Sequence, residues 1–449
     1  MISRRTDLRW CLRDVAEHLG GDLVGDPRIR VASVTIDSRN VDVGALFVAI
    51  AGEHFDGHNF ASDSVGAGAV AVVVRRGRHV EVEPRIEVDD TLEALRSLAV
   101  RRRDELGIPV VAVTGSTGKT STKDLIAAGI PGAWASPRSY NNEVGVPLTV
   151  LATPIDATAL IVEVGSRGAG HIAWLAPAIR PDVAVVTNLG VVHLETFGSP
   201  EGLANAKFEL IESLRPAGTA VLPSNEERLA RPIPQRTITF GSPPCDVEVS
   251  QVGVDADGGS RFTLDVGSRS FDVSLAMAGT HQAYNAAAAV SVARALDLPV
   301  ESFIEGMCSA VGSLWRMDVH REGRYTVVND AYNANPQSVA AALETVAHMP
   351  GRSIAVLGPM AELGSVCEEE HRAMGRLAAS LGFHKVIVVG ADHGYGLGAP
   401  DVVVYATDTA AAMDTLSGVL ESGDVVVVKA SRSAGLERLA LALIKESTP

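Results

Sequence analysis

The sequence has few cysteines and few aromatic residues. Its 449 residues include four cysteines, and aromatic residues make up 4% of the chain. The cysteines are far apart and form no Cys-x-x-Cys pair; they are Cys11, Cys245, Cys308 and Cys367. This pattern predicts neither a disulfide framework nor a cysteine-bound metal, and it is typical of reduced thiols in a cytoplasmic protein.

Basic residues and long apolar runs are also scarce. The 39 basic residues stand against 54 acidic ones, so the formal net charge is -15. This balance argues against a general nucleic-acid binder, although a local basic site for a phosphorylated ligand stays possible. No apolar run reaches about 18 residues, so we expect no membrane insertion. The basic start MISRRTDLRW has no apolar segment after it and does not resemble a secretory signal.

Apolar residues and glycine are abundant. Hydrophobic residues make up 46% of the chain and there are 43 glycines. At about 150 residues per domain, the length predicts two to four domains. Short apolar strands that alternate with alanine-rich helices predict an α/β fold.

The first part of the chain mixes strands with polar turns. Strands are expected within 31–41, 44–50 and 67–74, and a helix over 91–106 after two aspartates that can cap it. The charged segment 75–86 is interpreted as an edge or a linker. These features predict a small N-terminal α/β domain over 1–88.

The pattern in the middle of the chain predicts a mostly parallel sheet. Wholly apolar strands are predicted at 109–115, 159–165 and 182–190, with helices between and after them. Residues 235–278 suggest antiparallel strands, and an alanine-rich helix follows. A new strand–helix series begins beyond Arg316 and predicts a second doubly wound unit. We therefore divide the chain into 1–88, 89–313 and 314–449.

The strongest local motif is TGSTGKTS at 114–121. A strand precedes it and a helix follows, which is the context that a phosphate-binding loop requires. Lys119 would neutralise phosphate oxygens and Thr120 would offer its hydroxyl to Mg²⁺. The first glycine of the common longer motif would fall at Val113, so this loop is a shorter variant. The alternative is a glycine turn with a chance lysine, and the agreement of strand, glycines, Lys-Thr pair and helix argues against it.

Two further residues are candidates because of their positions in the sequence, and a third is not. Glu163 ends an apolar strand, where a carboxylate is costly unless it meets a cation, so it is a candidate Mg²⁺ ligand. A solvated strand end is the alternative. His193 follows the next strand, at the same predicted sheet edge, which favours a ligand role, although a lone histidine is more often a structural residue. Lys207 lies in a predicted helix and, taken alone, is interpreted as a surface lysine.

Eleven segments, in this order, resemble the Mur ligase family over nearly the whole chain. They are DSR (37–39) with the following 44–60, TGSTGKTS (114–121), YNNEVGVPLT (140–149), EVGSRGAGHI (163–172), TNLGVVHLETFGS (187–199), AKFE (206–209), GTHQAYNAAAA (279–289), WRMDV (315–319), NDAYNANPQS (329–338), LGPMAELG (357–364) and VKASRS (428–433). The DAYNANP segment resembles the branch of the family that adds a D-alanyl-D-alanine dipeptide. The DYAHTP-like and DNPR-like segments expected of the branch that adds the third peptide residue are absent.

The resemblance implies a three-domain cytoplasmic enzyme of peptidoglycan precursor synthesis. A UDP-binding N-terminal domain, a central P-loop-type ATP-binding domain and a C-terminal Rossmann-like domain would share one site. ATP would phosphorylate the terminal carboxylate of UDP-N-acetylmuramoyl-tripeptide, and the amino group of D-alanyl-D-alanine would attack the acyl phosphate. The expected partners are these two substrates, without nucleic acid, and the expected state is a monomer.

The resemblance also implies roles for individual residues. Thr120 and Glu163 would hold one Mg²⁺, and His193 with a carbamylated Lys207 would serve a second. ATP would contact the phosphate loop and three further residues, which are Gly115, Ser116, Thr117, Gly118, Lys119, Thr120, Ser121, Asn285, Arg316 and Asp330. The substrate contacts would be Ser38, Arg39, Asn141, Asn142, Tyr332, Asn333 and Asn335, and the closed cleft would also include Lys429, Ser431 and Arg432.

The sequence departs from the family pattern at three places and leaves two rival functions. Asn329, Pro359 and Gln282 stand where the family commonly has acidic, acidic and asparagine residues. These departures bear on nucleotide and dipeptide contacts. The rivals are another amide ligase of the superfamily, such as the folylpolyglutamate-synthase type, and a non-catalytic ATP-binding regulator. The UDP-domain segments argue against the first rival, and the retained phosphate-loop and metal residues argue against the second.

Overall fold

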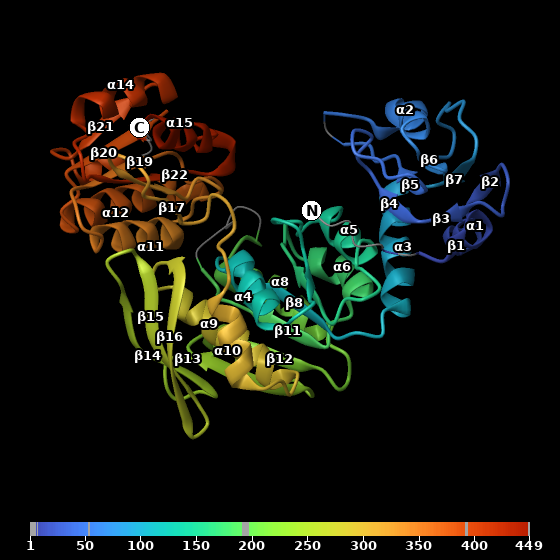
Figure 1. The fold of residues 1–449 in the computed structure, drawn as a ribbon, viewed down its shortest axis with the longest axis horizontal. Coiled ribbons are helices and arrows are strands. Elements are labelled where there is room, and N and C mark those ends of the chain that lie inside the picture. Colours follow the sequence, from blue (N-terminus) through green and yellow to red (C-terminus); the bar gives the residue numbers. More distant parts are fainter. Residues whose placement is uncertain (1–5, 7, 53, 191–196, 391–393, 448–449) are drawn as a thin grey trace.

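Three large sheets follow one another along the chain. The computed structural model describes residues 6, 8–52, 54–190, 197–390 and 394–447. A five-stranded, a nine-stranded and a six-stranded sheet form an N-terminal, a central and a C-terminal unit. The N-terminal unit, in blue, and the C-terminal unit, in orange and red, lie on opposite sides of the central unit (Figure 1).

The N-terminal sheet has the strand order β2-β7-β6-β5-β4 and is parallel except for β2. Its strands are β2 (Asp22–Val24), β4 (Ser33–Thr35), β5 (Ala45–Val48), β6 (Ala71–Arg75) and β7 (Arg85–Val88). Beside it are the short pair β1 (Trp10–Cys11) and β3 (Arg30–Val31), with helices α1 (Leu12–Leu19) and α2 (Ala61–Gly66).

Strand β7 corrects the interpretation of the segment 75–86. The end of this segment is neither an edge nor a linker, because it begins strand β7, which lies between β2 and β6 inside the sheet. Ile86 and Val88 are buried, whereas Arg85 and Glu87 pair with each other at 2.8 Å. Charged Arg85 and Glu87 alternate with apolar Ile86 and Val88, so the sequence-based prediction missed a half-buried strand.

Helix α3 (Thr91–Glu105) connects the N-terminal unit to the central one. Asp90 caps it, because its carboxylate accepts hydrogen bonds from the backbone of Leu92 and Glu93, as the sequence predicted. The helix contacts α1 and also the central helices α5 (Gly145–Leu151) and α6 (His171–Ile179). Arg103 is buried and donates to the carbonyl of Ile179 at 2.7 Å, which anchors α3 in the central unit.

The central sheet has the order β16-β15-β14-β13-β12-β11-β8-β10-β9. Its strands are β8 (Val110–Thr114), β9 (Trp134–Ala135), β10 (Leu160–Glu163), β11 (Val183–Val186), β12 (Thr219–Pro223), β13 (Arg236–Gly241), β14 (Val247–Val254), β15 (Gly259–Val266) and β16 (Arg269–Ala278). Only β14, β15 and β16 pair antiparallel, so the prediction of antiparallel strands is wrong for β13. β13 runs parallel to β12 and buries Ile238 and Phe240 in the same core as helix α9 (Gln282–Ala295).

Helices cover both faces of the central sheet, as its apolar strands predicted. Val111 and Val113 of β8 face one core and Val110 and Ala112 face the other. Helices α4 (Lys119–Gly129), α9 (Gln282–Ala295) and α10 (Val300–Cys308) cover the first core. Helices α5 (Gly145–Leu151), α6 (His171–Ile179) and α8 (Pro200–Glu212) cover the second, together with α3.

The C-terminal sheet has the order β17-β18-β22-β19-β20-β21 and is parallel except for β17. Its strands are β17 (Asp318–His320), β18 (Thr326–Asn329), β19 (Ser353–Leu357), β20 (Lys385–Val389), β21 (Val403–Ala406) and β22 (Val425–Lys429). Its helices are α11 (Pro336–Ala347), α12 (Cys367–Ser380), α13 (Tyr395–Gly398), α14 (Thr409–Val419) and α15 (Glu437–Ser447). Two cores, one on each face of the sheet, confirm the predicted doubly wound unit.

The described residues also contain four short 3-10 turns, namely η1 (Gly57–Phe60), η2 (Glu227–Leu229), η3 (Gly364–Val366) and η4 (Arg432–Ala434). In the described part of the chain, no helix has the length and apolar character needed to cross a membrane.

Candidate active site

The loop between β8 and α4 has the backbone of a phosphate-binding loop. Gly115 has a φ of +142° and Gly118, which precedes α4, has a φ of +77°. A Cβ atom on Gly115 would lie 2.0 Å from the hydroxyl oxygen of Thr187, so no larger residue fits there. The Asn188 side chain holds the loop from outside, because its Oδ1 accepts from the Thr117 backbone N–H at 3.0 Å and its Nδ2 donates to the Thr117 hydroxyl at 2.6 Å. The sequence did not single out Asn188, since only the folded loop brings it there.

Lys119 is the buried cation of this loop. Its Nζ donates to the carbonyl oxygens of Gly115 at 2.8 Å and Ser116 at 3.1 Å. Burial lowers the pKa of Lys119 to about 8, against the opposing attraction of Glu163. The helix amides and this ammonium together favour a bound anion.

Glu163 is fully buried at the end of β10, so the alternative of a solvated strand end is wrong. Its carboxylate accepts hydrogen bonds from the Thr120 hydroxyl at 2.8 Å and from the Asn141 amide at 2.7 Å. The buried Lys123 of α4 donates to the carbonyls of Ser136 and Arg138 and so holds the loop that carries Asn141. The hydroxyl and carboxylate oxygens are ligand atoms that suit Mg²⁺.

Lys207 is buried in α8, with 2% of its surface exposed, so the interpretation as a surface lysine is wrong. Its Nζ lies 5.8 Å from the centre of the Phe197 ring. Burial holds the pKa of Lys207 well below its usual value, and repulsion from Lys119 adds to this. His193, the predicted partner of Lys207, lies outside the described residues. Within those residues, no three or more His, Cys, Asp or Glu side chains are grouped as a metal would require.

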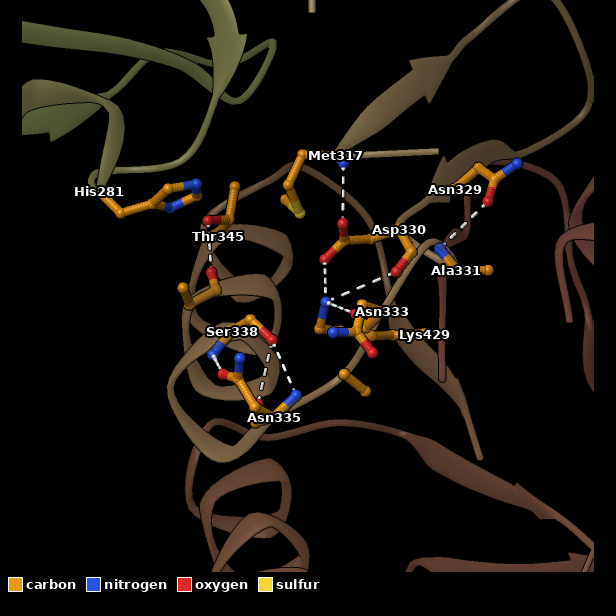
Figure 2. Close-up of polar contacts among 12 residues, drawn as sticks. His281, Met317, Asn329, Asp330, Ala331, Asn333, Asn335, Ser338, Thr345 and Lys429 are labelled. Atoms are coloured by element: carbon orange, nitrogen blue, oxygen red, sulfur yellow. Dashed lines mark hydrogen bonds and ion pairs between the residues drawn. The ribbon is translucent and has the colours of Figure 1, made fainter. Parts of the chain in front are cut away.

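A buried ion pair forms the opposite wall, which belongs to the C-terminal unit. Lys429 at the end of β22 lies 2.5 Å from a carboxylate oxygen of Asp330, and its Nζ also donates to the Asn333 carbonyl at 2.9 Å (Figure 2). The other carboxylate oxygen of Asp330 accepts from the Met317 backbone N–H at 3.1 Å. Burial lowers the pKa of Lys429, and the attraction of Asp330 opposes this.

Arg316 links this wall to the phosphate loop. Its guanidinium stacks on the Tyr332 ring at 4.2 Å and donates to the Ser139 hydroxyl at 3.1 Å. Ser139 in turn lies 3.4 Å from the Thr120 hydroxyl. A cation therefore stands between the two units, close to the residues around Glu163.

Two predicted substrate contacts also cap helices. Asn142 accepts from the backbone of Gly145 at the start of α5, at 2.8 Å. Asn335 accepts from the backbone of Ser338 at 2.9 Å, which fixes the start of α11 (Figure 2). Their side-chain oxygens thus have structural tasks that the sequence did not indicate.

One cavity of about 640 Å³ brings most of the predicted residues together between the central and C-terminal units. The predicted residues that line it are Gly115, Ser116, Thr117, Gly118, Lys119, Thr120, Ser121, Asn141, Asn142, Glu163, Lys207, Asn285, Arg316, Asp330, Tyr332, Asn333, Asn335 and Lys429. Further lining residues that the sequence did not single out include Asn188, His281, Tyr284 and Gln337.

The remaining predicted residues lie elsewhere. Ser431 and Arg432 line a smaller cavity of about 260 Å³, which shares Asn333 and Asn335 with the large one. Ser38 and Arg39 lie in the N-terminal unit and do not line the large cavity. There Arg39 is exposed and pairs with Asp37 at 2.8 Å.

The fold and this site define an α/β protein with a nucleotide-phosphate loop, and three family models match it along the chain. Residues 113–293 match the Mur ligase middle domain, residues 315–432 the Mur ligase glutamate ligase domain, and residues 30–103 the Mur ligase family catalytic domain. The chain belongs to the Mur ligase family, which confirms the resemblance of its motifs and the predicted three-part α/β fold.

Individual relatives match over nearly the whole length. The UDP-N-acetylmuramoyl-tripeptide–D-alanyl-D-alanine ligase of Mycobacterium bovis is 36% identical, over 93% of this chain and 92% of its own. A crystal structure of MurF from Acinetobacter baumannii is 28% identical with a TM-score of 0.89, and covers 98% of this chain and 99% of that one. MurF ligase from Thermotoga maritima, solved in complex with ADP, is 28% identical with a TM-score of 0.83, over 93% and 98%.

Proposed function

We propose that this chain is the cytoplasmic, ATP-dependent ligase that joins D-alanyl-D-alanine to UDP-N-acetylmuramoyl-tripeptide in peptidoglycan precursor synthesis, releasing ADP and phosphate. The large cavity carries this proposal, because the phosphate loop and the wall of the C-terminal unit face each other across it. The full-length relative of that name, 36% identical, supports the choice of substrates.

The three units divide the work among them. Residues 1–88 bind the UDP part of the substrate through Ser38 and Arg39, residues 89–313 bind ATP, and residues 314–449 bring the dipeptide. The protein acts as a monomer. The smaller cavity beside Asn333 and Asn335 is a suitable place for the dipeptide, since it adjoins the large one and contains the cationic Arg432.

The reaction brings two anions together, and the site is built to offset their repulsion. A carboxylate oxygen of the tripeptide attacks the γ-phosphorus of ATP, ADP leaves, and an acyl phosphate results. The dipeptide amine attacks the carbonyl carbon, loses a proton, and the tetrahedral intermediate expels phosphate that retains the former carboxylate oxygen. Lys119 and the α4 amides hold the phosphates in place, and Arg316 approaches them from the C-terminal side.

The residues fit a magnesium ion beside the phosphate loop. Thr120 and Glu163 place a hydroxyl and a fully buried carboxylate 2.8 Å apart, and a buried carboxylate is stabilised by a cation. Mg²⁺ bound there would screen the negative charge of the phosphates. Asn141 keeps the Glu163 carboxylate in position for that task.

A second magnesium site would use His193 and a carbamate on Lys207. The nitrogen of a neutral lysine bonds to the carbon of carbon dioxide and releases a proton, which leaves an anion in place of a cation. The lowered pKa of Lys207 supplies the neutral amine that this step needs.

Phosphate release from ATP tests the proposal. We expect release only when UDP-N-acetylmuramoyl-tripeptide and D-alanyl-D-alanine are both present. Release with a folate and glutamate instead would favour the folylpolyglutamate-synthase type of ligase. ATP binding without release under either condition would favour a regulator, and both results would contradict the proposed function.

A further inference from the structure

The buried ammonium of Lys123 holds the loop 136–142, which follows β9. Lys123 is 3% exposed. Its Nζ donates to the carbonyl oxygens of Ser136 at 2.9 Å and Arg138 at 3.1 Å, and lies 2.9 Å from Oδ1 of Asp124. An ammonium has three N–H groups, so these three oxygens satisfy it. Arg138 has a φ of +50°, a left-handed conformation that is costly for a residue with a side chain, and the bond from Lys123 stabilises it.

Both ends of this loop contact Glu163. The Ser136 hydroxyl accepts from the Glu163 backbone N–H at 3.0 Å, and Nδ2 of Asn141 donates to Oε1 of Glu163 at 2.7 Å. The other carboxylate oxygen accepts from the Thr120 hydroxyl at 2.8 Å. The loop thus fixes the main chain and the carboxylate of Glu163 together, and the position of both depends on Lys123.

The linker between α10 and β17 contacts the same structure at two points. The Ser313 hydroxyl donates to Oδ2 of Asp124 at 2.5 Å, while Oδ1 of Asp124 faces the Lys123 ammonium. The Arg316 guanidinium donates to the hydroxyl of Ser139, in the middle of the loop, at 3.1 Å. A change in the position of the linker would therefore reach the loop and, through the loop, the carboxylate at the end of β10.

Hydrogen-bond partners that orient a metal-binding carboxylate raise its affinity, because the ligand need not be ordered when the cation binds. Lys123 lies one step beyond such partners. It does not line the large cavity, and it acts through Ser136 and Asn141 rather than on a bound nucleotide. A lysine that only stabilised the fold would affect nucleotide binding equally with and without a divalent cation, so the two roles can be told apart.

We propose that Lys123 is a positioning residue for the divalent-cation site at Thr120 and Glu163. Through Asp124, this positioning depends on the linker to the C-terminal unit. The inference rests on the magnesium site of the proposed function. A divalent cation is then held most tightly while the hydrogen bond from Ser313 to Asp124 is intact, so cation binding and this position of the linker favour each other.

Calorimetric binding of the β,γ-imido analogue of ATP, with saturating Mg²⁺ and with EDTA, tests the proposal in the full-length protein. The ratio of the two dissociation constants measures how much the cation tightens binding. Lys123→Met keeps the length of the side chain and removes the ammonium. We expect it to reduce that ratio about tenfold, as loss of a partner that orients a metal ligand does, and to leave binding in EDTA unchanged. Lys445→Met makes the same change at an exposed position of α15 and should behave as the parent.

Ser313→Ala tests the contribution of the linker. It removes the hydroxyl that bonds to Asp124 and should lower the same ratio about threefold, the effect of one modest hydrogen bond. Combined with Lys123→Met it should cause no further fall, because both changes act on one path. Additive effects of the two changes, or an unchanged ratio in Ser313→Ala, would contradict the dependence on the linker.

The outcomes separate positioning from a structural role. Equal weakening by Lys123→Met with Mg²⁺ and with EDTA, or an unchanged ratio, would overturn the proposal. If circular dichroism shows that Lys123→Met does not fold, Ser313→Ala decides, because its bond reaches the loop through Asp124 and Lys123. A parent whose binding Mg²⁺ does not tighten would overturn the magnesium site and this proposal with it.

Binding of the analogue does not depend on ligation. A parent that binds the analogue more tightly with Mg²⁺ but does not ligate would contradict the proposed function alone. A parent that ligates, with variants that leave the ratio unchanged, would contradict this proposal alone.

Discussion

Lys119 and Lys207 have lowered pKa values for a shared reason, since both are buried and repel other cations at one site. Their expected tasks differ. Lys119 must be charged to hold phosphates, whereas Lys207 must be neutral to take up carbon dioxide. The pKa of Lys119 is lowered only to about 8, so Lys119 is largely charged near pH 7. Burial holds the pKa of Lys207 well below its usual value, which favours the neutral amine.

Lys119→Ala should leave the fold intact and abolish ligation. The ammonium bonds to two loop carbonyls and contributes charge rather than core packing. One preorganised electrostatic contact is worth about 3–4 kcal/mol in the transition state, so we expect turnover to fall at least several-hundredfold. Steady-state kinetics measures the loss, and circular dichroism and the melting temperature check the fold.

The pH profile gives the matching control. Lys119 of the free enzyme loses its proton as pH rises through about 8, so kcat/KM for ATP should fall above that pH in the parent. The variant should lack this fall. Turnover of Lys119→Ala close to that of the parent would contradict the role given to Lys119.

Lys207→Ala should be nearly inactive, and added acetate should restore part of its activity. The short carboxylate would occupy the place of the carbamate anion beside the second metal site. Rates measured against acetate concentration, with chloride at equal ionic strength as control, test this. A variant as active as the parent without any added anion would mean that Lys207 carries no carbamate.

At the residue scale, the sequence identified Glu163 as a candidate site residue, but it did not predict that Lys207 is buried. A carboxylate at the end of an apolar strand is conspicuous in the sequence itself. The burial of Lys207 depends on which faces of α8 are covered, and α8 buries residues on both sides of it, including Ala206 and Phe208. Asn188 could not be found either, because its task arises from a loop that folds back on the phosphate loop.

The ends of two neighbouring parallel strands form the wall of the large cavity that belongs to the C-terminal unit. Asn329 of β18 pairs with Val428 of β22, so the residues that follow, Asp330 and Lys429, meet at one edge. Both are buried, and neither charge can be solvated by water alone. The pair therefore stabilises the arrangement of the two strand ends while it lines the cavity.

Lys429→Met should destabilise the C-terminal unit by about 3 kcal/mol or more, because it leaves the Asp330 carboxylate buried without its cation. Urea unfolding followed by fluorescence measures the shift, and adding Asp330→Asn to the same chain should recover part of it. Lys445→Met, on the exposed side of α15, serves as the matched control and should change little. Equal stability of Lys429→Met and Lys445→Met would contradict the importance of the pair.

At the element scale, alternating and continuous apolar runs predicted most strands and helices. They failed for β7, where charged residues alternate with Ile86 and Val88. They also failed for the direction of β13, because a strand that pairs in parallel can have the same local sequence pattern as one that pairs antiparallel. Strand direction is decided by the partner strand and by the helix that covers it, neither of which the local sequence contains.

At the scale of the whole molecule, the residues proposed to bind UDP lie apart from the large cavity. Ser38 and Arg39 lie in the N-terminal unit, whereas the cavity is lined by residues of the central and C-terminal units. The C-terminal unit already touches the phosphate-loop side, because the Gln337 amide packs against Gly190. The order of motifs predicted three units, but their mutual placement depends on long-range packing such as that of α3.

Binding of ATP and substrate should draw the units together. One long substrate must reach from the N-terminal unit to the cavity, and the expected hinges lie near residues 89 and 313. Solution X-ray scattering should give a smaller radius of gyration with a non-hydrolysable ATP analogue and UDP-N-acetylmuramoyl-tripeptide than without them. An unchanged scattering profile at saturation would contradict closure.

The fate of one oxygen atom tests the proposed function most directly. UDP-N-acetylmuramoyl-tripeptide labelled with ¹⁸O in its terminal carboxylate is incubated with ATP and D-alanyl-D-alanine, and the products are analysed by mass spectrometry. We predict UDP-N-acetylmuramoyl-pentapeptide together with inorganic phosphate that contains one ¹⁸O for each amide formed, because the carboxylate oxygen leaves with the phosphate. Pentapeptide with unlabelled phosphate would contradict the acyl-phosphate route, and the absence of pentapeptide would contradict the function itself.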